Sequence, residues 1–243
     1  MTCIKIVINC QFKETISTMK IILMRHMQRY KTPTFYTELT IEGREQAKER
    51  IDILKNQSID LVFSSPFLRT LQSIEPFIKD TNQKINIEYG ISEAMISDNF
   101  NEFNSQIDIE NIPRHFFQYI NQNYKSVASN TMLNYPESFS AIDNRIQIFI
   151  DYLLNQYGNS DKTILIVSHM TTINTFIQLF YKKNCLSCHM DVEQFKFPIG
   201  AIFKIDCLTL KPSFVTNEDS VCLQYQAKTK AGSGFVFLKM ITE

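Results

Sequence analysis

Two short apolar runs, each followed directly by a histidine, constrain this chain more than any other feature. Residues 20–25 precede His26, and residues 163–168 precede His169. Near-continuous apolar runs of this length are typical of parallel strands that are buried on both faces. Because such strands need helices on both sides of their sheet, we expect an α/β fold.

The rest of the chain supplies the alternating elements that this class requires. Further strands are predicted at residues 3–10 (at an edge), 60–63, 85–89 and 201–205, with a hairpin formed by 221–226 and 234–240 across Gly232-Ser-Gly234. No linker or internal repeat interrupts the pattern. We therefore predict a single three-layer α/β/α domain over residues 1–243, with a mostly parallel central sheet and residues 1–18 as an N-terminal extension.

Four helices are predicted from apolar periodicity and end signals. Thr40 caps the first, whose inward positions are Ala47, Ile51 and Leu54. Ser65 as N-cap and Pro66 as first helical residue begin the second, and Pro76 is expected to kink or end it. The third covers 138–157 and closes at Gly158, and the fourth runs from Thr171 or Thr172 to about Lys182.

Residues 94–136 are less regular and rich in Asn, Ser and aromatic residues. A long, weakly patterned segment inside a compact domain is usually functional, so we predict an inserted cap or lid that is partly helical near 112–122. Its aromatic side chains are expected to form a small core of their own. His115 is expected to be a lid or surface residue.

Composition excludes several partners. Lys+Arg 25 against Asp+Glu 25 gives a formal net charge of zero, so no global field attracts nucleic acid or an anionic membrane. No apolar run is long enough for a membrane span, and the first ten residues do not predict a signal peptide. Any anion site must therefore be local.

The six cysteines are scattered and predict free thiols in a reducing compartment, hence a cytoplasmic protein. Cys185-Leu-Ser-Cys188-His189 matches the pattern for covalent haem attachment, which we interpret as a chance match in a surface loop. As a CxxC metal half-site it lacks a clear second half. We predict no cofactor and no metal.

Charged and titratable side chains follow four of the predicted strands. They are Arg25, His26 and Arg29 after the first central strand, Arg69 one helical turn after the next, Glu93 after the third and His169 after the fourth. Ligands of open α/β sheets bind at the carboxyl ends of the strands, where these six residues should converge.

This set of side chains suits phosphoryl transfer. Arginine binds phosphate oxygens with paired donors, and a helix N-terminus near Ser65 adds a favourable dipole. A neutral histidine can attack phosphorus and form a covalent intermediate. Glu93 could protonate the leaving alcohol if burial or the phosphate dianion raises its pKa.

Five motifs in register over roughly residues 20–180 resemble the histidine phosphatase superfamily, which has the phosphoglycerate mutase-like fold. The motifs are Leu23-Met24-Arg25-His26-Met27, Leu39-Thr40-x-x-Gly43-x-x-Gln46-Ala47, Ser64-Ser65-Pro66-x-x-Arg69-x-x-Gln72, Glu93 after a strand, and Val167-Ser168-His169. The resemblance implies that His26 is the phosphorylated nucleophile and Glu93 the acid. It implies that Arg25, Arg69 and His169 bind the phosphoryl group.

The resemblance also separates the branches of the family. Arg29 falls where phosphatases of the Arg-His-Gly-x-Arg type have an added phosphate ligand, which favours a metal-independent phosphomonoesterase over a mutase. Met27 and Met170 replace small residues of the family beside the catalytic histidines, and Met27 is costly if residue 27 needs a positive φ or lies close to the ligand.

Three functions remain open at this stage: the phosphatase, a mutase, and a phosphate-binding pseudoenzyme weakened by the two methionines. The expected substrate is a phosphorylated small molecule or a phosphoprotein. Its identity and the oligomeric state are left open, and specificity is expected to lie in residues 94–136.

Overall fold

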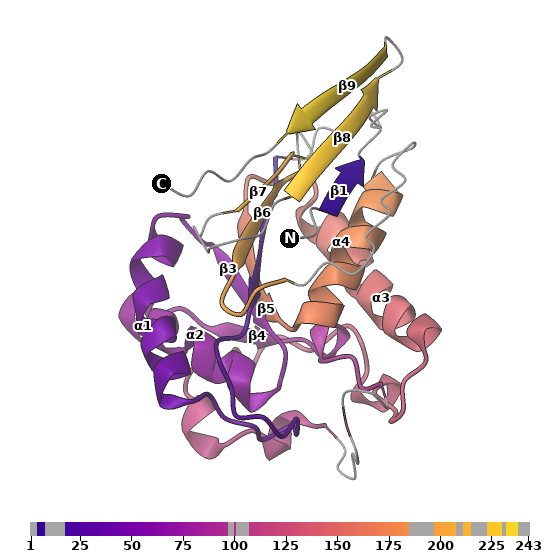
Figure 1. Cartoon of the computed structure of the whole chain (residues 1–243). Coiled ribbons are helices and arrows are strands. Elements are labelled where there is room, and N and C mark those ends of the chain that lie inside the picture. The colour runs from indigo at the N-terminus through magenta and orange to yellow at the C-terminus, as the bar shows by residue number, and fades with distance from the viewer. Residues whose placement is uncertain are drawn as a thin grey trace.

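A central mixed sheet organises the computed structural model, which describes residues 4–7, 18–96, 100, 107–184, 197–207, 211–214, 223–229 and 232–237. The strands of this sheet are β2 (Lys20–Arg25), β3 (Leu61–Ser64), β4 (Ile85–Ile87), β5 (Thr163–Ser168), β6 (Ile202–Asp206) and β7 (Lys211–Phe214). Their order is β4-β3-β5-β2-β6-β7 (Figure 1). The first four in that order run parallel, β6 pairs antiparallel with β2, and β7 pairs antiparallel with β6. The mostly parallel sheet is confirmed.

Helices cover both faces of the sheet. One face carries α1 (Ile41–Lys55) and α2 (Leu68–Thr81), and the other carries α3 (Phe139–Tyr157) and α4 (Met170–Asn184) (Figure 1). Both faces need cover because alternate side chains of β2 are apolar on each side. Ile22 and Met24 pack in the cluster that contains α1 and α2, whereas Ile21 and Leu23 pack with α3 and α4. The predicted three layers are confirmed. No helix among the described residues has the length and hydropathy to cross a membrane.

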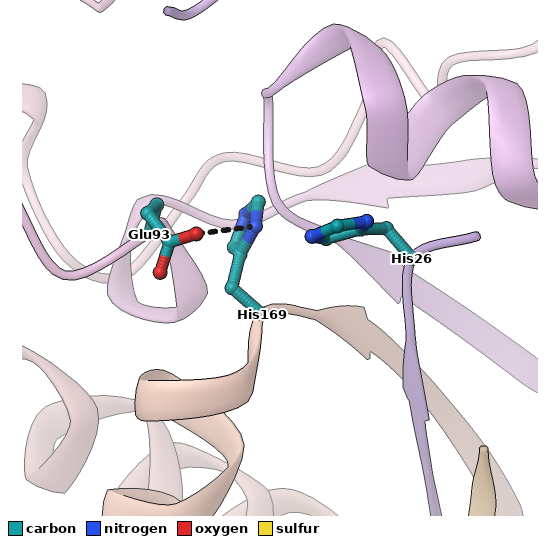
Figure 2. Close-up of side chains that lie close together, drawn as sticks. All are labelled: His26, Glu93 and His169. Atoms are coloured by element: carbon teal, nitrogen blue, oxygen red, sulfur yellow. Dashed lines mark ion pairs between the residues drawn. The ribbon is translucent and has the colours of Figure 1, made fainter. Parts of the chain in front are cut away.

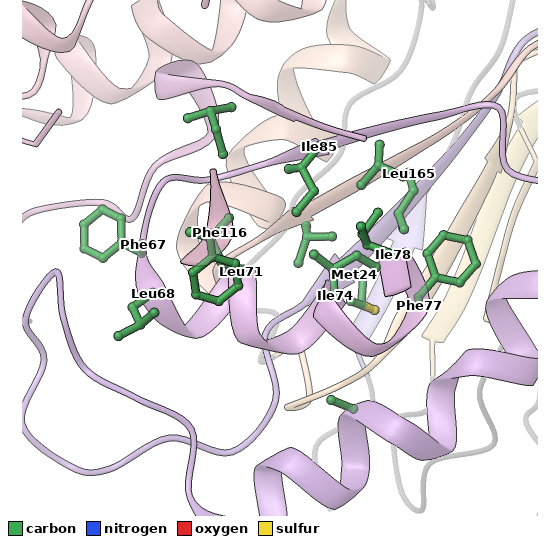
Figure 3. Packing of buried hydrophobic residues seen from close by; sticks show 14 of the residues in the cluster. Met24, Phe67, Leu68, Leu71, Ile74, Phe77, Ile78, Ile85, Phe116 and Leu165 are labelled. Carbon is green, nitrogen blue, oxygen red and sulfur yellow. The ribbon is translucent and has the colours of Figure 1, made fainter. Parts of the chain in front are cut away.

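The apolar face of α2 forms much of the core on its side of the sheet (Figure 3). Leu71, Ile74 and Ile78 are each 0% exposed and belong to the same cluster as Leu165 of β5. This packing explains why Pro76 does not end the helix, which continues to Thr81. Burial of the side chains before and after Pro76 outweighs the missing backbone donor.

Two of the predicted helix starts are confirmed, and one is wrong. Thr40 accepts a hydrogen bond from the backbone N–H of Gly43 at 3.0 Å, and Ser138 caps α3 in the same way. Helix α2 begins at Leu68, with Phe67 as N-cap, not at Pro66 after Ser65. The reason is that the backbone N–H of Ser65 still donates to Val167 of β5 at 3.0 Å, so the chain at this point continues the sheet.

A second, smaller sheet has the order β1-β8-β9, formed by β1 (Ile4–Val7), β8 (Leu223–Thr229) and β9 (Gly232–Phe237). The edge position of the first strand and the C-terminal hairpin are confirmed. The predicted turn at Gly232-Ser-Gly234 is wrong, because these three residues lie within β9. Strand β4 is also shorter than predicted, since the Glu88 side chain accepts from the backbone N–H of Gly90 and starts a 3-10 turn over Tyr89–Ile91.

The described parts of residues 94–136 pack closely on the domain. Their regular structure consists of 3-10 helices at Ile109–Asn111, Arg114–Phe116 and Asn130–Met132. The one at Arg114–Phe116 confirms that the segment is partly helical near 112–122. Phe100 and Phe116 join the core cluster of α1 and α2, which corrects the prediction of a separate small core. Ile120 forms a bridge with Ile85 and covers the edge of β4. The role of residues 94–136 as a cap or lid stays a prediction.

Candidate active site

The register of β2 and β5 brings the two histidines together. Arg25 of β2 pairs with Ser168 of β5, so the next residues, His26 and His169, leave the sheet side by side (Figure 2). Their ring centroids are 5.3 Å apart, and the backbone N–H of His26 donates to Ser168 at 3.1 Å. Both side chains are buried, at 2% and 0% exposure.

The hydrogen bond of His26 fixes its tautomer. Its Nδ1 lies 2.7 Å from the backbone oxygen of Met27, and a carbonyl oxygen can only accept, so Nδ1 carries the proton. The other nitrogen, Nε2, then keeps its lone pair. Burial, followed by the charges of Arg69 and His169, holds the pKa of His26 well below its usual value. The imidazole is therefore neutral at pH 7 and can act as a nucleophile.

His169 connects Ser65 to Glu93. Its Nε2 lies 2.8 Å from the Ser65 hydroxyl, and its Nδ1 lies 3.2 Å from Oε2 of Glu93 (Figure 2). Burial lowers the pKa of His169 to about 4, although Glu93 partly opposes the shift. Since Glu93 faces Nδ1, the ring orients one nitrogen toward the carboxylate and the other toward the hydroxyl.

Glu93 is ionised in this arrangement. The same Oε2 accepts a hydrogen bond from Nη2 of Arg69 at 3.2 Å. Burial alone would raise the pKa of Glu93, but His169, then Arg69 and His26, outweigh it and hold that pKa well below the usual range. Burial therefore does not make Glu93 a proton donor, as the sequence had left open. A second negative charge, such as a phosphate dianion, would be needed.

Arg25 and Arg69 present two guanidiniums at this edge. Arg69 is 0% exposed, donates from Nη1 to the backbone oxygen of Thr34 at 2.9 Å, and stacks on Phe67 with Cζ 4.6 Å from the ring centroid. Burial lowers the pKa of Arg69 to about 10, so it stays charged at pH 7. Arg25 donates to the backbone oxygen of Phe197. In the part of the chain that the structure describes, the buried Nε of each guanidinium has no hydrogen-bond partner.

Arg29 contacts its own loop, and its role as an added phosphate ligand stays a prediction. Its Nη1 donates to the backbone oxygens of Tyr30 at 2.7 Å and Lys31 at 2.8 Å, and so fastens its own loop. Its charge still lies close enough to lower the pKa values of Arg25 and Arg69. Arg29 thus adds positive charge near the other two guanidiniums, and its own Nη1 is already occupied by the loop.

The start of α1 holds the loop after His26. Gln28 donates its backbone N–H to Oε1 of Gln46 at 3.1 Å, and its backbone oxygen accepts from Thr40 at 3.0 Å. A Cβ on Gly43 would lie 2.0 Å from that oxygen, so only glycine allows this approach. The motif from Leu39 to Ala47 therefore fixes the backbone that carries the predicted nucleophile.

Met27 fits its position without strain. The described non-glycine residues with positive φ are Ser58 and Asn82, so Met27 has an ordinary backbone. Its N–H donates to the Ser73 hydroxyl at 2.8 Å, and its side chain is 0% exposed in the α1–α2 core cluster. The positive φ that would have made methionine costly is absent. Met170, the first residue of α4, packs against the opposite cluster.

Sequence reasoning missed several residues of this site. Ser65 was predicted as a helix cap and instead contacts His169. Ser73, which holds Met27, was not singled out. Neither was Arg145, although it lies between Ile142 and Phe149 on the apolar face of α3, where a charged residue signals a buried role.

The same cluster has ligand atoms for a metal ion. Among the described residues, His26, Glu93 and His169 offer one ligand atom each, all within 4.8 Å of one another. Imidazole and carboxylate are ligands of several divalent metals. The contact between Arg69 and Glu93 disfavours a cation there and favours an anion.

Residues 21–189 match the histidine phosphatase superfamily (branch 1). This match covers more than half of the chain, which therefore belongs to that superfamily. The resemblance inferred from the five motifs is confirmed at the level of the family.

Individual relatives are distant. A probable phosphatase of Schizosaccharomyces pombe is 28% identical over 137 residues, which are 55% of this chain and 44% of that protein. The chain thus spans less than half the length of this relative. Phosphoserine phosphatase 1 of Hydrogenobacter thermophilus is 23% identical over 163 residues, 62% of this chain and 70% of that one. The ecdysone phosphate phosphatase of Bombyx mori, solved with tungstate, has a TM-score of 0.60 at 14% identity, covering 80% of this chain and 91% of that one. At this identity the structural likeness concerns the fold.

Proposed function

We propose that this chain is a phosphomonoester hydrolase that acts through a covalent phosphohistidine on His26. The observation that carries the proposal is the hydrogen bond from Nδ1 of His26 to the backbone oxygen of Met27, at 2.7 Å. It leaves the lone pair on Nε2, and the low pKa of the ring keeps that lone pair available at neutral pH.

The charged neighbours of His26 support an anionic substrate. Each of Arg25 and Arg69 has a buried Nε–H without a partner among the described residues, and a phosphate oxygen would satisfy these donors. Arg29 adds positive charge at the rim, and His169 offers a further contact. Together they would stabilise the charge that spreads over the equatorial phosphoryl oxygens in the transition state.

The reaction then has two steps. Nε2 of His26 attacks phosphorus, the bond to the ester oxygen breaks, and the leaving alcohol takes a proton from Glu93. In the second step water attacks phosphorus, the P–N bond breaks, and Glu93 takes the proton of the water. Glu93 must be protonated before the first step. The substrate dianion beside it supplies the like charge that raises its pKa.

The proposed substrate is a phosphorylated small molecule or a phosphoprotein, and no step uses a metal ion. The name of the Hydrogenobacter relative, a phosphoserine phosphatase, makes phosphoserine a sensible first compound to test.

A generic aryl phosphate tests the proposal. The wild-type protein should release phosphate with and without a chelator, and His26→Ala should not. His115→Ala is a matched control because His115 is exposed on a 3-10 turn. Dependence on a bisphosphorylated primer would indicate a mutase, and phosphate binding by folded wild-type protein without turnover would indicate a pseudoenzyme. Either result would overturn the proposal.

A further inference from the structure

A buried ion pair lies directly behind Glu93. Arg145 of α3 and Glu137 are fully buried, with 0% side-chain exposure each. Nε and Nη2 of Arg145 donate to the two carboxylate oxygens of Glu137 at 2.8 and 3.0 Å. This bidentate pairing fixes the plane of the guanidinium.

The remaining donors of Arg145 hold the segment that carries Glu93. Nη1 donates to the backbone oxygens of Gly90 at 2.9 Å and Ser92 at 3.0 Å, and Nη2 donates to that of Glu93 at 3.1 Å. A guanidinium has five N–H donors, and all five are thus used inside the protein. Arg145 has no donor left for a ligand, so any role in the reaction must act through residues 90–93.

Other side chains complete the support of this segment. The hydroxyl of Ser168 donates to the backbone oxygen of Ile91 at 2.8 Å, and the hydroxyl of Thr172 donates to that of Ser92 at 2.7 Å. Every backbone oxygen from Gly90 to Glu93 is therefore held by a side chain. Since Ser168 directly precedes His169, these contacts tie the position of Glu93 to that of the histidine it faces.

We propose that Arg145, oriented by Glu137, is a positioning residue that aims the Glu93 carboxylate at the leaving-group oxygen. This inference rests on the proposed function, because it assigns Arg145 a part in the proton transfer by Glu93. Stability alone is a weak reason for such a pair, because buried ion pairs can often be replaced by apolar residues without loss. The fork of Arg145 supplies geometry, and proton transfer depends on donor placement to within a fraction of an ångström.

The test uses two aryl phosphates of similar shape, 4-nitrophenyl phosphate and phenyl phosphate. Nitrophenolate leaves readily without a proton, whereas phenolate benefits from an acid. Arg145→Lys keeps the charge but loses the fork. We therefore expect kcat/KM for phenyl phosphate, which reports the first step and not the attack of water, to fall ~10–100-fold, less than the ~10²–10⁴-fold that a general acid contributes in full. The value for 4-nitrophenyl phosphate should fall by no more than about threefold. Glu93→Gln should show the same selective loss.

Two further variants separate positioning from folding. Glu137→Leu with Arg145→Met replaces the ion pair by apolar groups of similar size, and should fold and show the same selective loss. Leu153→Ala in α3 creates a packing defect away from residues 90–93 and should affect both substrates equally.

The outcomes distinguish this inference from the function on which it rests. Equal effects of Arg145→Lys and of the double variant on both substrates, including no effect, would overturn the positioning role while leaving the phosphatase intact. Wild-type protein that hydrolyses neither compound would overturn the proposed function, and the positioning role with it.

Discussion

Lowering the pH should destabilise the fold through His169 before any carboxylate in the site is protonated. The pKa of His169 is about 4 in the folded chain, against 6.5 as the ordinary value, because burial penalises the charged ring. Between these values the unfolded chain binds more protons than the folded one, so stability rises with pH and is lost as pH falls below 6.5. One pKa unit is worth ~1.4 kcal/mol, which gives about 3 kcal/mol in total and about 2 kcal/mol by pH 4.5.

His26 adds to this loss with the same sign, because its pKa is also held well below 6.5. The contribution of Glu93 to stability changes over a different, lower pH range. Its folded pKa lies below its ordinary value of 4.5, so its contribution is present above that pH and is lost only as pH falls further. The loss between pH 6.5 and 4.5 thus reports the histidines.

Urea unfolding at several pH values measures the effect, with His26→Asn/His169→Asn as the comparison. Asparagine retains a donor near the position of each Nδ1 but does not titrate. The wild-type free energy of unfolding should drop by at least about 2 kcal/mol between pH 6.5 and 4.5, and the double variant should lose much less. A flat wild-type profile, or equal slopes in both proteins, would refute the reasoning.

Three further changes give separate tests. Arg69→Lys should lower kcat/KM for an aryl phosphate by at least ~10²-fold, because lysine lacks the paired donors of the guanidinium. Arg44→Lys changes an exposed ion pair and should leave kcat/KM unchanged. Similar effects of the two substitutions on kcat/KM would exclude Arg69 from the site. Leu71→Ala should lower the free energy of unfolding in urea by about 2–5 kcal/mol, because Leu71 is fully buried. Ile41→Ala, at an exposed position, should lower it by less than ~0.5 kcal/mol. A loss below about 1 kcal/mol for Leu71→Ala would contradict the packing of α2. Thr40→Ala should lower the free energy of unfolding by about 1 kcal/mol, because α1 loses its N-cap. An unchanged urea midpoint would count against the hydrogen bond between Gly43 and Thr40.

The sheet and its two helical layers could be predicted because they depend on local pattern. Residues 163–168 are apolar enough to require burial on both faces, and all six are buried. The convergence of His26 and His169 followed from the rule that parallel strands end at one edge, and the β2–β5 register accounts for it.

Features that depend on tertiary contacts could not be predicted. Ser65 has the local signature of a helix cap, but its backbone pairs with β5 and its hydroxyl contacts His169. Pro76 has the signature of a helix end, but the core packing of α2 continues past it. The low pKa of Glu93 depends on His169 and Arg69, two residues that lie far from it in the sequence.

Trapping the intermediate tests the central claim most directly. Wild-type protein mixed with an aryl phosphate and quenched in alkaline denaturant should carry one phosphoryl group on His26, located by peptide mass spectrometry, and His26→Ala should carry none. Glu93→Gln should accumulate more of the adduct than wild type with 4-nitrophenyl phosphate, because water attack on it is slowed. Turnover without a phosphorylated His26, or a phosphoryl group that persists in His26→Ala, would contradict the account.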